Sequence, residues 1–394
     1  MAKFPEEPVK VLAPRSTAQR VSRRAFLAGS TVAVFSSSVL LAACGSNEPA
    51  PGGGTGGGGQ LEDQLNFYNW DEYDDPELFK QFTADIGPNV QIDTYPSNEA
   101  MIAKLTTAAG TTGYDVVVPT GPFIPLMVQN DLLEELDLSK IPNFSNLDSL
   151  YTNQDFDPGN KHAVCKDWGS TGWIVDKSKI STPIETWQYF LDVATGEASG
   201  QTSVLDAPNE LLGLYCWSKA IDWNTTDAAV YDEYENYMVN TLAPNLKNFD
   251  SYSGVPTTQG RYALAQVWNG DARAGILGKG VDRERFVWGL GAPDTELWMD
   301  NWAIVKGAQH PEASYAWINY ILDPANSITD LNYHGYNTGV NGVKDLAEQA
   351  GAEMLDLVFF TPEQVATMHT QTVNEMLDRQ VEIYNNVKAA AGLG

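Results

Sequence analysis

Carboxylates and aromatic side chains recur at a few points where a predicted strand ends or a predicted helix begins. The residues concerned are Trp70, Asp71, Tyr73, Asp206, Glu210, Trp268, Trp298 and Asp300. An ammonium group gives up its water only when a charged acceptor replaces it, and methylene groups favour flat apolar walls. A tryptophan face adds a cation–π attraction of about 0.5 to 2 kcal/mol. This combination of residues indicates a site for an amine cation.

Each of these residues also has a purely structural interpretation. A tryptophan of an α/β domain belongs to the core more often than to a binding site. Asp206 could cap the helix that begins at Pro208, and Glu210 could complement the dipole of that helix. Only the joint placement of acids and aromatics favours binding.

The elements that must position these residues alternate between strands and helices. Strands are predicted at 65–70, 90–95, 114–119, 171–175, 203–205, 286–288 and 302–305, and helices at 76–85, 98–109, 209–221, 230–240, 261–267, 311–322 and 362–387. The continuous apolar run at 114–119 is typical of a parallel sheet covered on both faces. Open α/β sheets bind ligands at the carboxyl ends of their strands, so the sequence predicts that these loops meet.

Composition supports a folded, acidic protein. The chain has 394 residues, of which 43% are hydrophobic and 11% aromatic, which suffices for a core and suggests two or three domains. It carries 51 acidic and 24 basic residues, for a formal charge of -27. Nucleic acid is therefore excluded as a partner, although the acidic surface could equally serve only to keep an exported protein soluble.

The N-terminus reads as an export signal over residues 1–43. Arg23 and Arg24 are followed by Phe-Leu, as in twin-arginine signals, and the run 25–43 is uncharged and apolar. This run is near the length that spans a membrane, so an anchor is the alternative. However, it ends in Leu-Ala-Ala-Cys44-Gly, which matches the bacterial lipobox, and Cys44 is predicted to carry a lipid.

Residues 44–64 are predicted to form a flexible tether, because they are rich in glycine and proline and cannot bury a core. About 330 globular residues follow, enough for two lobes. We expect residues 65–171 with 301–345 in the first lobe, and 172–300 with 346–394 in the second. Cys165 and Cys216 could form a disulfide or remain two buried thiols, and their spacing does not decide between these.

Several segments resemble the bacterial spermidine/putrescine (polyamine) binding proteins of ABC importers. The matching pieces are Phe67-Tyr68-Asn69-Trp70 with Tyr73, Ser97-Asn98-Glu99, Ala103-Lys104-Leu105, residues 114–119, residues 143–148, residues 168–172, residues 224–227, Trp268-Asn269-Gly270, Trp298-Met299-Asp300 and Gly335-Tyr336. The resemblance covers most of residues 65–340. It implies an α/β, two-lobed periplasmic-binding-protein-like fold, in which each lobe is a mostly parallel sheet flanked by helices and the ligand cleft lies between the lobes.

The resemblance also implies a function. The chain would be a monomeric, lipid-anchored, extracytoplasmic binding protein that captures putrescine or spermidine and delivers it to the permease subunits, with no enzymatic activity, cofactor or metal. Carried over by position, Trp70 and Tyr73 would line the cleft from the first lobe, and Thr120 would place a hydroxyl near an amine.

In the second half of the chain the resemblance assigns both walls and charges to the cleft. Trp268 and Trp298 match aromatic walls, Asp300 matches a carboxylate that grips an amine, and Tyr336 matches a phenol at the cleft edge. Glu210 matches a glutamate that opens a helix of the second lobe. Together these positions would hold both the charges and the carbon chain of the ligand.

One stretch departs from the family pattern. The family has two successive aspartates followed two residues later by Arg-Glu, whereas this chain has Asp206-Ala207-Pro208-Asn209-Glu210. One aspartate and the arginine are missing. Asp71 stands where a neutral hydroxyl residue is common, so the lost charge could be recovered there. The preferred polyamine therefore stays open.

Other functions remain as alternatives. Asp206 and Glu210 could serve a secreted glycoside hydrolase, which also lines its site with tryptophan. A binding protein for an opine or for iron is a further alternative, although iron favours clustered tyrosines. The four histidines show no zinc-binding spacing, and no nucleophile-elbow, phosphate-binding or dinucleotide motif is present.

Overall fold

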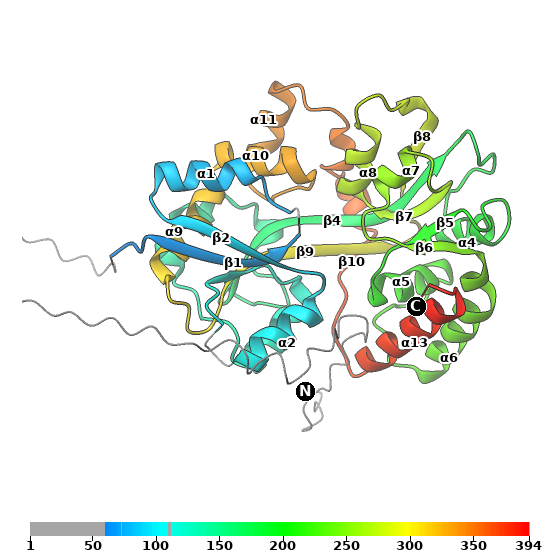
Figure 1. Ribbon diagram of the computed structural model, residues 1–394, viewed down its shortest axis with the longest axis horizontal. Coiled ribbons are helices and arrows are strands. Elements are labelled where there is room, and N and C mark those ends of the chain that lie inside the picture. The colour runs from blue at the N-terminus through cyan, green and yellow to red at the C-terminus, as the bar shows by residue number, and fades with distance from the viewer. Residues whose placement is uncertain (1–59, 72, 109–111, 394) are drawn as a thin grey trace, which may run out of the picture. The chain divides into compact units, whose positions relative to one another are not determined.

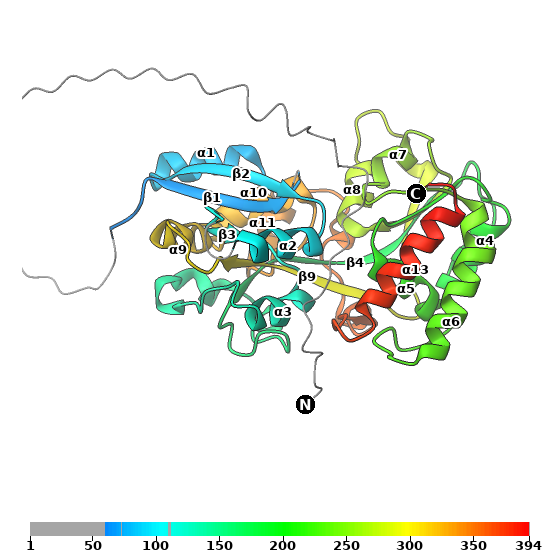
Figure 2. The same cartoon turned by 60° about the horizontal axis from the view of Figure 1, so that its bottom comes forward.

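The computed structural model describes residues 60–71, 73–108 and 112–393, and Figures 1 and 2 show this part of the chain in two views. The predicted signal, Cys44 and most of the predicted tether lie outside the described residues. Among the residues described, no helix is both long and apolar enough to cross a membrane.

Strands and helices alternate along most of the chain, as the sequence predicts. The strands are β1 Gln64–Trp70, β2 Asn89–Tyr95, β3 Val116–Val117, β4 Ala163–Asp176, β5 Thr202–Val204, β6 Leu246–Phe249, β7 Leu264–Trp268, β8 Phe286–Leu290, β9 Thr295–Ile304 and β10 Met368–His369. The α-helices are α1 Pro76–Asp85, α2 Asn98–Ala108, α3 Ile124–Gln129, α4 Trp187–Thr195, α5 Pro208–Ser218, α6 Ala228–Tyr237, α7 Gly254–Thr258, α8 Asn269–Ile276, α9 Pro311–Ile321, α10 Pro324–His334, α11 Val343–Gln349, α12 Pro362–Val365 and α13 Leu377–Ala390.

Eight of the strands follow one path of hydrogen-bonded neighbours, in the order β2-β1-β3-β9-β4-β7-β5-β6. The three strands at each end of this path are parallel to one another. The two long strands β9 and β4 lie in the middle, antiparallel to each other and to their outer neighbours. In Figure 1 they are the two ribbons that connect the groups of helices on either side.

The first group of helices packs on both faces of β1, β3 and β9. Phe67 of β1 lies in a core with α1 and α9, whereas the adjacent Tyr68 lies in a core with α2 and α3. Trp302 and Ala303 of β9 divide between the same two cores. This alternation is what a strand buried on both faces requires. The parallel strand pattern predicted for residues 114–119 is thus confirmed.

The second group is built in the same way around β4, β5 and β7. Trp173 and Leu264 pack with α4, α5, α6 and α13, which lie together in Figure 2. Ile174 and Ala265 point to the opposite face and pack with α8. The free thiols of Cys165 and Cys216 are buried in different cores, so they do not form a disulfide.

Two predicted helices are wrong. The segment 261–267 is largely the strand β7, which lies between β4 and β5 and is buried along most of its length. Its Ala, Leu and Gln residues favour a helix locally, but burial on both faces of a sheet overrides that preference. The segment 362–387 is also not one helix, because β10 pairs with β9 between α12 and α13.

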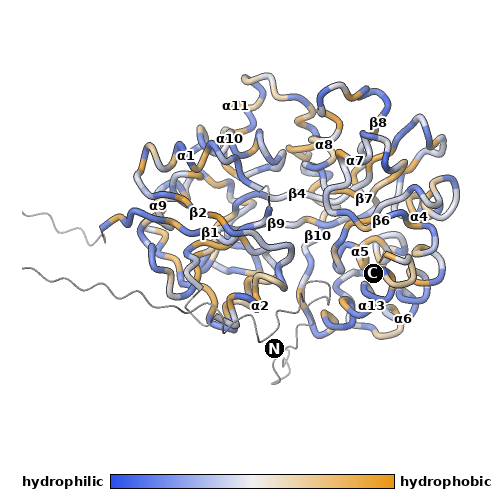
Figure 3. The backbone as a smooth tube through the Cα atoms, in the orientation of Figure 1, coloured by the Kyte–Doolittle hydropathy of each residue, from blue (hydrophilic) through white to orange (hydrophobic). Residues whose placement is uncertain are grey.

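The middle of β4 and β9 is more polar than the ends, and Figure 3 draws much of it in pale and blue tones. Gly169 of β4 lies opposite Trp298 of β9. A methyl group at Gly169 would overlap the Trp298 ring and the side-chain oxygen of Asn269. Glycine is therefore required here by the close approach of a ring.

Gly169→Ala is expected to destabilise the protein by about 1 to 3 kcal/mol, because the added methyl must displace the Trp298 ring or Asn269. Urea unfolding followed by circular dichroism measures this change. The double variant Gly169→Ala/Trp298→Leu should lose less stability than the sum of its single variants, since the obstructing ring is gone. Strict additivity would contradict the contact.

Candidate functional site

Polar and acidic residues gather on one face of the β4–β9 strand pair. The register places Asp167 of β4 opposite Asp300 of β9, and Gly169 opposite Trp298. Glu296 lies two residues before Trp298, and alternate residues of a strand share a face. Acidic groups therefore lie on both sides of a tryptophan along one strand.

A β-bulge interrupts the pairing at Lys166. Cys165 pairs with Asn301 and Asp167 with Asp300, which leaves Lys166 as the extra residue. Its ammonium group is fully buried and lies 2.9 Å from Asp167, 3.2 Å from Asp74 and 3.3 Å from Asp330. Burial opposes the charge, but these three carboxylates raise the pKa of Lys166 well above its usual value. Lys166 is therefore a permanent internal cation.

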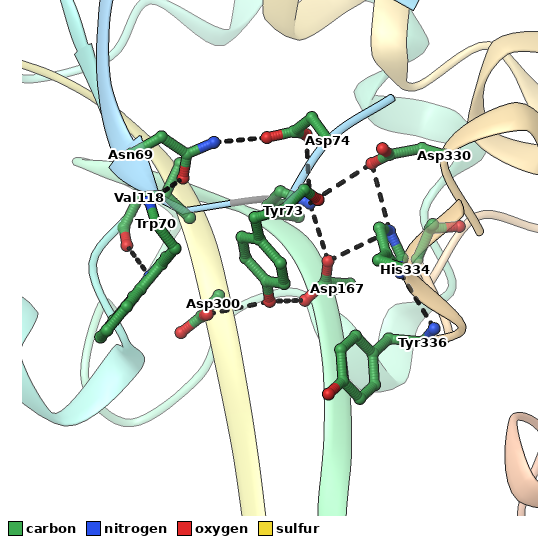
Figure 4. A network of polar contacts seen from close by, with 12 residues as sticks. Asn69, Trp70, Tyr73, Asp74, Val118, Asp167, Asp300, Asp330, His334 and Tyr336 are labelled. Carbon is green, nitrogen blue, oxygen red and sulfur yellow. Dashed lines mark hydrogen bonds and ion pairs between the residues drawn. The ribbon is translucent and has the colours of Figure 1, made fainter. Parts of the chain in front are cut away.

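His334 closes this polar network, which Figure 4 shows. The backbone N–H of Tyr336 donates to Nδ1 of His334, so Nε2 carries the hydrogen and faces Asp330 at 3.2 Å and Asp167 at 3.3 Å. Asp167, Asp330 and His334 have the mutual spacing of cation ligands. Because Lys166 already lies between the two aspartates, the network supplies its own cation.

The pKa values of the two outer aspartates of this network diverge. Burial raises the pKa of Asp74 to about 7, although Lys166 opposes the shift. Burial also acts on Asp330, but Lys166 and His334 outweigh it and lower the pKa of Asp330 to about 2. Of the two, Asp330 therefore holds the stronger ion pair with Lys166.

Tyr73 connects the lysine network to Asp300. Its hydroxyl lies 2.5 Å from Oδ1 of Asp167 and 2.9 Å from Oδ2 of Asp300, as Figure 4 shows. A phenol has one hydrogen, so it donates to one carboxylate and the other carboxyl must be protonated for a second bond. Burial and the nearby charge of Asp167 raise the pKa of Asp300 to about 7, which identifies it as the protonated partner.

Thr120 is the other neighbour of Asp300. The amide of Asn98 donates to Oγ1 of Thr120 at 2.9 Å, and the Thr120 hydroxyl lies close enough to Asp300 to oppose the rise in the pKa of that carboxyl. The two residues also form a backbone bridge. The predicted grouping of Tyr73, Thr120 and Asp300 is therefore present in the structure.

An aromatic group lies next to Asp300. The ring centroids of Trp298 and Tyr336 are 4.7 Å apart in an edge-to-face arrangement, and Tyr336 stacks on His334. A methyl group at Gly270 would overlap the Tyr336 ring, which explains the glycine of the Trp268-Asn269-Gly270 motif. Trp298 is nine-tenths buried, yet its Nε1 has no hydrogen-bond partner within the described chain.

Glu210 and Glu296 form a second acidic group at the far end of β9. Thr171 and Trp268 donate to Oε1 of Glu210 at 2.7 and 2.6 Å, and Gln266 donates to Oε2 at 3.3 Å. Burial raises the pKa of both glutamates, and the proximity of Glu210 raises that of Glu296 further. Asn209, the residue before Glu210, donates to Oε1 of Glu296 at 3.4 Å, so the two carboxyl groups lie side by side, and Glu296, whose pKa rises further, is the protonated one.

Three predicted site residues form no hydrogen bond with the acidic groups around Asp300 and Glu210 in the part of the chain that is described. Trp70 donates its indole N–H to the carbonyl of Val118, and its ring packs on Tyr95. Asp71 is exposed. Asp206 accepts hydrogen bonds from Lys388 and Tyr384, and Ala207 occupies the N-cap position of α5 without a side-chain cap, so the capping interpretation of Asp206 is wrong.

Six titratable residues of the site are absent from the sequence-based predictions. They are Asp74, Lys166, Asp167, Glu296, Asp330 and His334. A signal existed for two of them, because Lys166 and Asp167 interrupt an otherwise uncharged stretch directly before Trp168. Glu296 alternates with Trp298 and Asp300, but the predicted strand began only at Trp302. The sequence suggests that Asp71 replaces the charge missing at Ala207, whereas in the structure Asp71 is exposed and Glu296 lies beside Glu210.

Lys166→Met is expected to destabilise the protein by about 3 to 5 kcal/mol, because it leaves three buried carboxylates without their cation. The loss should be larger at pH 8 than at pH 5, since protonation of the aspartates relieves their repulsion. Urea unfolding at both pH values measures it. Lys80→Met, which removes an exposed lysine, is the matched control. Equal losses for both variants would contradict the network.

Asp300→Asn is expected to stabilise the empty protein at neutral and higher pH. A carboxyl whose pKa is raised on folding costs stability as the pH rises from about 4 through about 7, and asparagine removes that cost. The gain should approach about 2 to 4 kcal/mol at pH 8 and vanish below pH 4. Thermal unfolding across this range tests it, with exposed Asp155→Asn as control. A gain independent of pH would rule out this origin.

The chain is similar to known proteins over most of its length. The model of the family "Bacterial extracellular solute-binding protein" matches residues 77–369. The spermidine/putrescine-binding periplasmic protein of Escherichia coli (strain K12) is 33% identical over 274 residues, which is 66% of this chain and 73% of that protein. The putrescine/agmatine-binding protein of Pseudomonas aeruginosa is 28% identical over 343 residues, covering 83% of this chain and 92% of that protein.

A solved structure shows the same fold. The spermidine/putrescine ABC transporter substrate-binding protein PotD of Streptococcus pneumoniae superposes with a TM-score of 0.70 at 28% identity, covering 84% of this chain and 100% of that chain. The predicted periplasmic-binding-protein-like fold is confirmed. The family match and the relatives' names also agree with the prediction of a binding protein rather than an enzyme. The chain belongs to the bacterial extracellular solute-binding proteins.

Proposed function

We propose that the chain captures a linear polyamine, putrescine or spermidine, outside the cytoplasm and delivers it to the permease of an ABC importer. The observation that carries this proposal is the order of side chains on β9, where Glu296 and Asp300 lie on either side of Trp298. Carboxyl groups at both ends suit ammonium groups, and the indole between them suits methylenes. The names of the relatives support the same ligand class.

The separation of the two acidic groups suits an extended ligand. Four residues of a strand place the Cα atoms of Glu296 and Asp300 about 13 Å apart. The side chains of Glu296 and Asp300 can lean toward each other, so the distance between their carboxyl groups, which the ligand must bridge, can be shorter than the distance between their Cα atoms. Putrescine offers two ammonium groups separated by four carbons, and spermidine adds a third. Both ligands are compatible with this span, and titration with each of them distinguishes the preferred one.

At the first acidic group, we assign the ammonium to Asp300, with Asp167, Tyr73 and Thr120 around it. The pKa of Asp300 is about 7, so this carboxyl loses its proton readily when a cation binds beside it. The ligand ammonium then becomes its counter-ion. Lys166 already neutralises part of the charge on Asp167. The ligand therefore competes least with internal ion pairs at Asp300.

Aromatic residues would hold the rest of the ligand. Trp298 and Tyr336 form the wall beside Asp300, and Trp268 holds Glu210 at the second acidic group. We keep Trp70 as a wall of the first lobe. Asp71 and Asp206 remain proposed contacts at the edge of the site, and Asp206 would have to exchange Lys388 for the ligand.

The proposal includes a place in the cell. Residues 1–43 would be the twin-arginine-type signal, Cys44 the lipidated residue and residues 44–64 the tether, so that a monomer faces the permease from the outer surface of the cytoplasmic membrane. The predicted lobes, 65–171 with 301–345 and 172–300 with 346–394, would close over the ligand. Ligand that contacts both lobes favours the closed state by its differential affinity.

The other ligand and enzyme classes fit the site less well. A glycoside hydrolase needs a free acid/base pair, but Asp206 is engaged by Lys388 and Glu210 by three hydrogen-bond donors. Iron favours tyrosinate ligands, and burial keeps the pKa values of Tyr73 and Tyr336 well above the usual range. An opine carries a carboxylate, which this acidic site would repel.

Calorimetric titration of the purified chain with putrescine, cadaverine, spermidine and spermine tests the proposal, with an iron salt and a neutral sugar as comparison ligands. We expect one-to-one binding of a polyamine that weakens at higher salt. Trp298→Ala should raise the Kd about 10- to 100-fold, because the methylenes and an ammonium lose their wall.

Tyr189→Ala, which removes an exposed aromatic ring, is the control and should bind as the unmodified chain does. If no amine binds, the proposed function is wrong. If Trp298→Ala lowers stability but leaves the Kd unchanged, Trp298 belongs to the core and not to the site.

A further inference from the structure

The contact between Glu210 and Glu296 has a chemical consequence for ligand capture, which rests on the function proposed above. Both side chains are almost completely buried, and Asn209, the residue before Glu210 on α5, donates to Oε1 of Glu296 at 3.4 Å, which places the two carboxyl groups next to each other. Two buried carboxylates in contact cannot both be charged without a cation, so one of them keeps a proton. Three donors hold Glu210 as the anion, and Glu296 is left as the protonated member.

Among the described residues, no lysine, arginine or histidine lies against the pair to replace this proton. From α5, Asn209 approaches Glu296 at 3.4 Å, and from β4 and β7 only the neutral donors Thr171, Gln266 and Trp268 reach Glu210. Asp300, farther along β9, adds repulsion. In the part of the chain that is described, neither glutamate forms an ion pair with a lysine, arginine or histidine.

The strand β10 brings one further titratable residue near the pair. His369 lies opposite Glu296 in the pairing of β10 with β9, but its ring is directed to Asp294 at 3.0 Å and is half exposed. Trp298, which shares the face of Glu296, is buried, and its indole N–H has no hydrogen-bond partner among the described residues. The two carboxyl groups therefore form an acceptor-rich position next to the proposed ligand wall, with no ion-pair partner among the described residues.

We propose that Glu296 binds a ligand ammonium group directly, and that in the empty site it holds the proton that this ammonium replaces. The exchange is balanced in charge and atoms. One proton leaves the Glu210–Glu296 pair for solvent, one ammonium enters, and its N–H groups donate to the two carboxylates. Capture of a polyamine is thereby linked to proton release at this end of the site.

The linkage predicts how affinity depends on pH. Below the pKa of Glu296, proton and ammonium compete for one position, so ligand affinity rises as the pH rises toward that pKa. Asp300 can release a proton in the same way at the other end. The contribution of Glu296 to the pH dependence of affinity is therefore the part of that dependence that is lost when Glu296 alone is substituted.

Calorimetry with putrescine at pH 6 in buffers of different ionisation enthalpy counts the protons released on binding. The unmodified chain should release protons, and Glu296→Gln should release about one fewer while binding putrescine more weakly, because the neutral amide neither carries the proton nor offers a charge. Glu348→Gln, an exposed glutamate on α11, is the matched control and should release as many protons as the unmodified chain.

Infrared difference spectra of the unmodified chain give a measurement without substitution. Addition of putrescine should remove the carbonyl band of a protonated carboxyl group, and in Glu296→Gln this loss should be smaller. Binding with undiminished proton release in Glu296→Gln would overturn the inference while leaving the proposed function intact. Failure of every polyamine to bind the unmodified chain would instead overturn the proposed function.

Discussion

The antiparallel pairing of β4 with β9 is the constraint on which the site depends. β4 contributes side chains to the cores of both groups and β9 pairs along it, so the register of this pair decides which side chains meet. Asp167 faces Asp300, and Gly169 leaves room for Trp298, only because the ladder holds them in that order. The helices on either side supply burial, which turns acidic side chains into groups with strongly shifted pKa values.

Burial of so many carboxylates without enough cations makes the empty site costly. Lys166 offsets the charge of three aspartates, and a shared proton offsets that of the glutamate pair. Asp300 has no lysine or arginine of its own within the described residues, so burial raises its pKa to about 7 and it keeps a proton in the empty site. A cationic ligand therefore relieves strain that is already present, and part of the stability of the liganded protein comes from the ligand.

Much of the fold followed from the sequence because the alternation of apolar runs and helical segments is local. The continuous run before Pro119 and the helix from Pro76 to Asp85 are both where they were predicted. The segment at β7 was not predicted, because its residues favour a helix until β4 and β5 bury them. The site divides in the same way. Tyr73, Thr120 and Asp300 were found by resemblance, whereas the partners of Lys166 come from segments distant in sequence, which only tertiary structure brings together.

The bulge at Lys166 limits how this region can change during evolution. One additional residue in β4 lets Cys165 and Asp167 keep their partners on β9 while Lys166 turns into the protein. Deletion of that residue would shift every later position of β4 by one and exchange the two faces of the strand. Charge reversals and changes of side-chain size are then open to selection here, but insertions and deletions are not. Ligand preference in this lineage should therefore vary by substitution within a fixed register.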